Sequence, residues 1–126
     1  MARVLVVDDD PDTVRIVTFR LQSNGHRTVG AHSPEEALEA IATRGRPDIV
    51  VLDVTMPGMN GMDLLAEIRT MDGMENLPAI FLSAKVTEED IEAGRAAGAV
   101  YLTKPFIATA LLNAIEEAIV PTLEAW

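Results

Sequence analysis

Short strand-like segments alternate along the chain with longer segments of helical periodicity, and this alternation limits the possible folds more than any other feature. The clearest strands are continuous apolar runs, at 4–7 (VLVV) and 49–52 (IVVL). Such runs are typical of parallel strands that are covered on both faces. The predicted strands are 4–7, 28–31, 49–52, 79–82 and 100–102. Five strand–helix units with short connections predict a doubly wound α/β fold, a three-layer sandwich with a parallel sheet between helices.

Local signals mark the ends of several predicted helices. The stretch 33–36 (SPEE) places a capping serine before a proline at the first helical position and a glutamate at the third. Asp10 can cap the first helix, and Asn24 with Gly25 ends it. The expected helices cover 11–24, 34–45, a segment with Leu64, Leu65 and Ile68, a segment that begins at Thr87, and 106–119.

The composition excludes several classes of protein and of site. A length of 126 residues suits one compact domain, and the absence of cysteine excludes disulfides and cysteine-based metal or redox sites. Twenty acidic against ten basic residues give a net charge of −10, which argues against direct binding to nucleic acid. No apolar stretch approaches the roughly 20 residues that span a bilayer. We therefore expect a soluble, cytoplasmic protein without membrane contact.

Chemically useful side chains stand where the predicted strands end. Three aspartates, at 8–10, follow the first strand, and Asp53 follows the third. Ser83 follows the fourth strand, and Lys104 comes two residues after the fifth. In open α/β sheets, ligands bind outside the carboxyl ends of the strands. We therefore expect these carboxylates, the hydroxyl and the ammonium to converge on one crevice.

The grouped carboxylates point to a metal ion and to phosphoryl chemistry. Several carboxylates in one crevice repel one another unless some are protonated or a cation lies among them. Oxygen ligands without cysteine or histidine favour a hard cation, Mg²⁺ with Mn²⁺ as a substitute. A carboxylate can act as a covalent nucleophile toward a phosphoryl group. A metal ion and a lysine would then neutralise charge on the transferring oxygens.

Motifs at four strand ends give the chain a resemblance to a known family. They are 6–11 (VVDDDP), 52–53 (LD) followed by 56–61 (MPGMNG), 82–84 (LSA) and 104–106 (KPF). Together they resemble bacterial response-regulator receiver domains of the chemotaxis-regulator type, over essentially the whole chain. The resemblance implies a flavodoxin-like fold with the parallel strand order 2-1-3-4-5. We expect the receiver domain to cover 1–120 and a C-terminal tail to cover 121–126, with no output domain.

The resemblance assigns separate roles to the acidic residues and their neighbours. Asp53 is similar to the phosphoacceptor, and Asp9 to the direct magnesium ligand beside it. Asp8 is expected to act on the ion mainly through water, and the backbone carbonyl of Thr55 to complete the protein ligands. The side chains of Thr55 and Lys85 occupy positions where this family tunes the lifetime of its aspartyl phosphate.

The resemblance also assigns roles at the ends of the last two strands. Lys104 is expected to pair with a phosphoryl oxygen, and Ser83 to hydrogen-bond another oxygen once phosphate is present. Tyr101 matches the aromatic switch position of the family. The peptide bond between Lys104 and Pro105 is expected to be cis.

A receiver of this kind is a signalling phosphoprotein rather than an enzyme, since it catalyses only its own phosphorylation and dephosphorylation. Its expected donor is a histidine kinase or a histidine phosphotransfer protein, with kinase docking on the first helix. Phosphorylation is expected to shift the surface of helix four, strand five and helix five between pre-existing states and so to engage a downstream protein. The expected molecule is a monomer, or a dimer that forms on phosphorylation.

Two other interpretations remain open from the residues. Asp8 and Asp10 after a strand also resemble the nucleophile motif of haloacid-dehalogenase-type phosphatases, in which Asp8 would attack the substrate. Against this, the chain lacks a later acidic pair at a strand end and a cap domain for substrate. The second alternative is a pseudo-receiver, a binding module that works through its surface without phosphorylation. The complete set of site residues argues against it.

Overall fold

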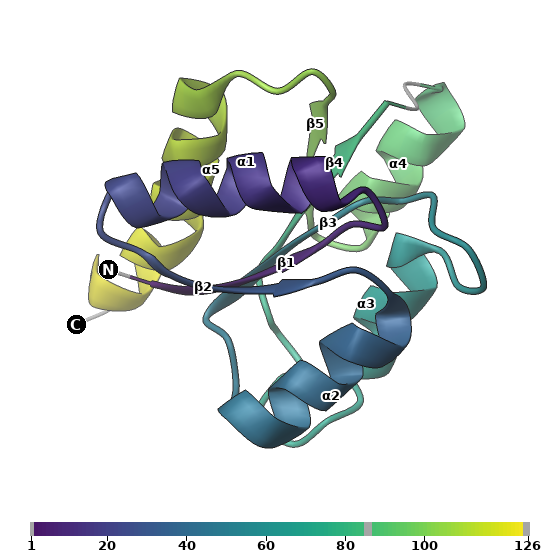
Figure 1. Cartoon of the computed structure of the whole chain (residues 1–126), viewed down its shortest axis with the longest axis horizontal. Coiled ribbons are helices and arrows are strands. Elements are labelled where there is room, and N and C mark those ends of the chain that lie inside the picture. Colours follow the sequence, from purple (N-terminus) through teal and green to yellow (C-terminus); the bar gives the residue numbers. More distant parts are fainter. Residues whose placement is uncertain (1, 85–86, 125–126) are drawn as a thin grey trace.

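The computed structural model describes residues 2–84 and 87–124, in which five strands alternate with five helices (Figure 1). The strands are β1 (Arg3–Val7), β2 (Arg27–Ala31), β3 (Ile49–Leu52), β4 (Ala79–Ser83) and β5 (Val100–Thr103). The helices are α1 (Pro11–Ser23), α2 (Pro34–Arg44), α3 (Gly61–Ile68), α4 (Glu88–Ala96) and α5 (Ala108–Glu124). The predicted alternation of strands and helices is confirmed.

All neighbouring strands pair in parallel, in the order β2-β1-β3-β4-β5. α1 and α5 cover one face of this sheet and α2 and α3 the other, while α4 packs beside β5 (Figure 1). The structure is therefore the expected flavodoxin-like sandwich with the expected strand order. Because the strands are parallel, their carboxyl ends all lie at one edge of the sheet.

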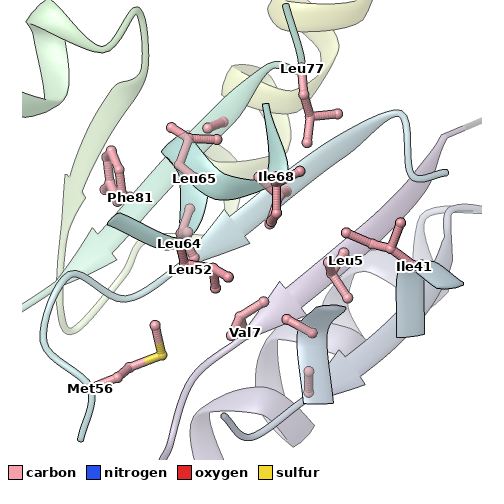
Figure 2. Packing of buried hydrophobic residues seen from close by; sticks show 14 of the residues in the cluster. Leu5, Val7, Ile41, Leu52, Met56, Leu64, Leu65, Ile68, Leu77 and Phe81 are labelled. Atoms are coloured by element: carbon pink, nitrogen blue, oxygen red, sulfur yellow. The ribbon is translucent and has the colours of Figure 1, made fainter. Parts of the chain in front are cut away.

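The apolar runs lie inside because helices cover both faces of the sheet. Every residue of β3 and of β4 is buried. Alternate residues of a strand point to opposite faces, so Leu5 packs in the layer with α2 and α3, whereas Val4 packs in the layer with α1 and α5. Figure 2 shows the first of these layers, in which Leu64, Leu65 and Ile68 of α3 pack with the sheet. Burial of each such side chain stabilises the fold by about 2 kcal/mol.

Side-chain caps start four of the helices. In each case the capping oxygen accepts a hydrogen bond from a backbone N–H two or three residues ahead. The capping residues are Asp10, Ser33, Asn60 and Thr87. Each cap stabilises its helix by about 1 kcal/mol. Each capping residue lies in the connection that leads from a strand to the next helix.

The last helix begins later than predicted. α5 starts at Ala108, two residues after the predicted start at Phe106. The Ile107 carbonyl oxygen accepts a hydrogen bond from the Leu111 N–H at 3.1 Å, so Ile107 is the residue that precedes the first turn.

The last helix also ends later than predicted, and the expected end at Ile119 is wrong. α5 continues to Glu124 and so includes most of the segment predicted as a tail. Pro121 removes one backbone donor, which costs stability but does not end this helix. Residues 125–126 and Lys85 lie outside the described residues. Among the helices of the described chain, none has the length and apolar character needed to cross a membrane.

Candidate functional site

The carboxyl ends of the strands bring the predicted site residues to one edge of the sheet. The register between β1 and β3 places the residues that follow these strands, Asp8 and Asp53, side by side. Ser83 ends β4, and its carbonyl oxygen accepts a hydrogen bond from the Lys104 N–H at 2.9 Å. The peptide bond that joins Lys104 to Pro105 is cis. Backbone pairing therefore brings all four strand ends to one edge of the sheet.

The Lys104 ammonium lies between two carboxylates that are remote from it in the sequence. Its Nζ donates hydrogen bonds to Asp8 Oδ2 at 2.6 Å and to Asp53 Oδ2 at 3.2 Å. The side chains of Asp8 and Asp53 are only 3% and 10% exposed, so both ion pairs form largely out of water. The Asp10 N–H donates to Asp8 Oδ1 at 2.9 Å and fixes the other oxygen of that carboxylate.

Burial and charge act in opposite directions on these side chains. Burial raises the pKa of the Asp8 carboxyl above its ordinary value, although the hydrogen bond from Lys104 opposes this shift. Burial alone would lower the pKa of Lys104, but the hydrogen bond to Asp8 and the charge of Asp53 outweigh it and raise that pKa. Lys104 therefore keeps its positive charge at neutral pH. This single charge does not balance the two carboxylates that the ammonium contacts.

Three carboxylates form a cluster beside Lys104. Asp8, Asp9 and Asp53 each offer one oxygen, and these oxygens lie within 4.8 Å of one another. Asp8 and Asp53 are buried, whereas Asp9 is exposed. An all-oxygen donor set with surplus negative charge suits a hard divalent cation such as Mg²⁺. The residues present therefore fit the metal ion that the resemblance implies.

The backbone around Asp53 is held by a glycine that the sequence reasoning did not single out. The Gly61 N–H donates to the Val54 carbonyl oxygen at 2.7 Å, and a Cβ at Gly61 would lie 2.0 Å from the Asp53 carbonyl oxygen. Only glycine lets α3 start so close to the chain that follows β3. Thr55 is exposed, and its N–H donates to Asp53 Oδ1 at 3.2 Å. The only sequence signal for this close approach was the position of Gly61 at the end of the 56–61 motif.

Tyr101 lies on β5 against α4 and next to Ser83. Its ring centroid is 6.2 Å from that of Phe81, and a Cβ at Gly94 of α4 would lie 3.0 Å from Tyr101 Cδ2. Burial raises the pKa of the Tyr101 hydroxyl, and a hydrogen bond with Ser83 opposes this shift. The ring is thus already partly buried, in space that Gly94 leaves free. The sequence assigned Tyr101 a role but contained no local signal for Gly94.

A parallel doubly wound sheet with clustered aspartates and a lysine at its carboxyl edge is the arrangement that the resemblance to receiver domains implies. The family model of the response regulator receiver domain matches residues 4–116, and the chain belongs to this family. The chain is 38% identical over 123 residues to the sensory/regulatory protein RpfC of Xanthomonas campestris pv. campestris, across 95% of this chain and 17% of RpfC. It is 34% identical over 116 residues to protein PilH of Pseudomonas aeruginosa, across 91% of this chain and 95% of PilH.

The solved structures show the same relationship. The receiver domain of the Francisella response regulator 1452 matches with a TM-score of 0.85 and 33% identity, over 97% of this chain and 99% of that domain. The chain spans only 17% of the length of RpfC but nearly all of PilH. It is a receiver domain of two-component signal transduction, as the motifs predicted. The comparisons favour neither the phosphatase nor the pseudo-receiver interpretation.

Proposed function

We propose that Asp53 accepts a phosphoryl group from a phosphohistidine and that this step drives the receiver. The observation that carries the proposal is the Lys104 ammonium held between the buried carboxylates of Asp8 and Asp53. In the transfer, an Asp53 oxygen forms the new O–P bond while the N–P bond of the phosphohistidine breaks. The imidazole leaves with the electron pair of that bond. If its other ring nitrogen carries no hydrogen, the departing ring takes up a proton from water.

Asp9 and Asp53 would hold Mg²⁺ directly, with Asp8 acting through water and the Thr55 backbone carbonyl as a further ligand. The three carboxylate oxygens within 4.8 Å of one another support this set. When bound, the ion supplies positive charge to the phosphoryl oxygens as negative charge develops on them. Mn²⁺ has a similar preference for oxygen ligands and would substitute.

Lys104 and Ser83 would hold the phosphoryl group once it is on Asp53. The Lys104 Nζ lies 3.2 Å from Asp53 Oδ2, so the arriving group meets an ammonium that is already in place. The group brings about two negative charges in place of one, which draws Lys104 toward it and away from Asp8. The Ser83 hydroxyl would donate to another phosphoryl oxygen and give up its hydrogen bond with Tyr101.

Tyr101 would carry the change to the surface formed by α4, β5 and α5. Its ring packs against Phe81 and next to Gly94, so a change in its hydrogen bonding alters the contact between β5 and α4. Phosphorylation needs to favour one of two states by only a few kcal/mol, roughly, to act as a switch. This surface is our proposed docking site for a downstream protein.

The donor would be a histidine kinase or a histidine phosphotransfer protein, since these carry the N–P bond. Ile16 and Phe19 of α1 are 49% and 64% exposed, and we place kinase docking there.

Water would later hydrolyse the aspartyl phosphate in a reaction that the domain itself catalyses. We assign the receiver to 1–120 of a cytoplasmic protein that acts as a monomer or as a phosphorylation-dependent dimer, with 121–126 as a C-terminal tail.

Intact-mass spectrometry after incubation with acetyl phosphate or phosphoramidate tests the proposal. The wild type should gain one labile phosphoryl adduct with Mg²⁺ and none with EDTA. Asp53→Asn should abolish the adduct, whereas Asp72→Asn, at an exposed aspartate after α3, should leave it unchanged. A folded protein that binds Mg²⁺ without gaining an adduct would instead be a receiver that works without phosphorylation. An adduct that survives Asp53→Asn and is lost in Asp8→Asn would make Asp8 the nucleophile.

A further inference from the structure

Four of the ten basic residues of the chain line a single cavity at the amino ends of β1 and β2, the opposite edge of the sheet from the aspartates. Arg3 and Arg27 are the first residues of β1 and β2. Arg44 ends α2, and Arg46 follows it across Gly45, with its guanidinium against Gly73 of the turn after α3. The cavity has a volume of about 280 Å³. So many cations around one cavity are unexpected in a chain whose net charge is −10.

The arginines are placed where their charges repel one another. Arg3 and Arg27 are register partners in the parallel β1–β2 pair, so their side chains leave the same face of the sheet side by side. Like charges at such positions destabilise a sheet. The turn after α2 adds to this crowding, because a Cβ at Gly45 would lie 3.8 Å from a guanidinium nitrogen of Arg3.

No carboxylate compensates these charges within the described residues. None of the four guanidiniums forms an ion pair there, and no acidic side chain lines the cavity. The nearby Asp48 carboxylate accepts a hydrogen bond at 2.9 Å from the backbone N–H of Arg3, not from its guanidinium. The lining of the cavity is therefore basic and favours an anion.

The wall between the guanidiniums is aliphatic. Leu5 and Val29 lie two residues beyond Arg3 and Arg27, so they project from the same face of the sheet. Ile41 of α2 lies opposite Leu5 (Figure 2). Leu5 and Ile41 are buried, so the apolar surface open to a ligand comes from the half-buried Val29, Ala40 and Pro47. A purely ionic ligand such as phosphate would leave this surface in contact with water, whereas a ligand with a flat apolar body would cover it.

We propose that the cavity binds a small phosphorylated molecule with a flat apolar body, of the nucleoside diphosphate class. Guanidinium groups pair with phosphate oxygens through two parallel hydrogen bonds and also stack on flat rings. The diphosphate removes the repulsion between the arginines, and the base covers the aliphatic wall. Four of the ten basic residues gather at one cavity on an acidic protein, and so small a basic area suits a small ligand better than a polymer. The site is independent of Asp53, which lies at the other edge of the sheet.

Isothermal titration calorimetry in EDTA, with ADP, GDP, pyrophosphate and adenosine as separate probes, tests the proposal. ADP or GDP should bind saturably and more tightly than either pyrophosphate or adenosine. Arg27→Gln and Arg44→Gln should each weaken nucleotide binding about tenfold, since each removes a charge-assisted hydrogen bond. Arg20→Gln and Arg95→Gln, at exposed arginines of α1 and α4, are matched controls and should leave the affinity unchanged.

A second measurement on the wild type removes dependence on the folding of the variants. Nuclear magnetic resonance should show ADP-dependent shifts of the methyl signals of Val29 and Ile41 and none around Asp53. Absence of saturable nucleotide binding overturns the proposal, as does binding that ignores the Arg27 and Arg44 substitutions. Equal affinity for pyrophosphate and ADP overturns the nucleoside assignment. Binding of an acidic peptide in place of nucleotides would assign the cavity to a protein partner.

Discussion

Lys104 shows at the scale of single residues how burial changes the value of an ion pair. Its ammonium contacts Asp8 and Asp53, whose side chains are 3% and 10% exposed. Removing one partner from such a site leaves a buried charge without compensation. The pair between Arg15 and Asp12 is also short, at 2.7 Å, but its side chains are 76% and 69% exposed, so water screens it. The two pairs therefore form a matched comparison.

We expect Lys104→Met to lower the free energy of unfolding by about 2 kcal/mol without divalent cations, because Asp8 and Asp53 then face each other uncompensated. Added Mg²⁺ should recover most of this loss, since it restores positive charge between the carboxylates. Arg15→Met should change the free energy of unfolding by less than about 0.5 kcal/mol. Urea denaturation with and without Mg²⁺ measures both variants. Equal effects of the two substitutions would contradict the role given to Lys104.

Gly61 is the second residue on which the site depends. Gly61→Ala places a Cβ 2.0 Å from the Asp53 carbonyl oxygen, and because the obstacle is backbone, the loop after β3 must move. We expect a loss of about 3 kcal/mol in the free energy of unfolding, together with slower phosphorylation by acetyl phosphate. Ala66→Ser, on the exposed face of the same helix, should show neither effect. Thermal denaturation and the rate of adduct formation are the two measurements. Phosphorylation at the wild-type rate would show that the backbone of Asp53 tolerates the shift.

At the scale of elements, α4 is less firmly packed than α3. It has one buried residue, Gly94, whereas α3 has four. Arg69 holds the carboxyl end of α4 through a hydrogen bond from its guanidinium to the Ala97 carbonyl oxygen. The same guanidinium donates to the Leu77 carbonyl oxygen at 2.8 Å. Elements with few buried contacts move at a low free-energy cost. α4 is therefore suited to respond when Tyr101 changes its hydrogen bonding.

Gly94→Ala tests the packing between α4 and β5. Its Cβ would lie 3.0 Å from Tyr101 Cδ2 and 3.4 Å from Phe81 Cδ2, so the tyrosine ring should move outward. Burial raises the pKa of Tyr101, and a more exposed ring should titrate at lower pH, closer to the ordinary value of 10.0. Tyr101 is the only tyrosine of the chain, so the change in ultraviolet absorbance when the phenol ionises reports this residue alone.

The stability of this variant should change by less than about 1 kcal/mol, because the better helix propensity of alanine offsets the crowding. Ala96→Ser, at an exposed position of the same helix, should leave the tyrosine titration where it is in the wild type. An unchanged titration in Gly94→Ala would mean that α4 moves away while the ring keeps its place.

At the scale of the whole molecule, the sheet carries opposite charge at its two edges. The aspartates follow the carboxyl ends of β1 and β3, and Arg3 and Arg27 stand at the amino ends of β1 and β2. Parallel strands make this separation possible, since every strand starts at one edge and ends at the other. A cation and an anion can therefore bind to the same sheet without competing.

Mg²⁺ should stabilise the whole molecule through its carboxyl edge. At a tenfold excess over its dissociation constant, a ligand of the folded state alone raises the free energy of unfolding by about 1.4 kcal/mol. Asp9→Asn should remove most of this gain without destabilising the metal-free protein, because Asp9 is exposed and adds a repelling charge. Asp72→Asn should keep the full gain. Thermal denaturation across a Mg²⁺ titration, reversed by EDTA, measures the effect; a gain that persists in Asp9→Asn would place the ion elsewhere.

Much of the fold could be predicted because its signals are local. The apolar runs marked the strands, and the caps at Asp10 and Ser33 marked two helix starts, since each signal acts within a few residues. The end of α5 could not be predicted in this way. A proline usually ends a helix because it lacks a backbone N–H, but α5 continues past Pro121. The strand order came from resemblance to a family, since the pattern itself does not specify which strands pair.

By itself, the sequence determined where the strands and helices form and which side chains stand at each strand end, because hydrophobic period and capping depend on neighbouring residues. Only the tertiary structure decided which of these side chains meet. Lys104 contacts Asp8 across 96 positions of the chain, and Gly94 leaves space for Tyr101. The arginine cavity likewise joins three separate segments. Such distances follow from strand order, register and packing, which are properties of the whole molecule and are carried by no local pattern.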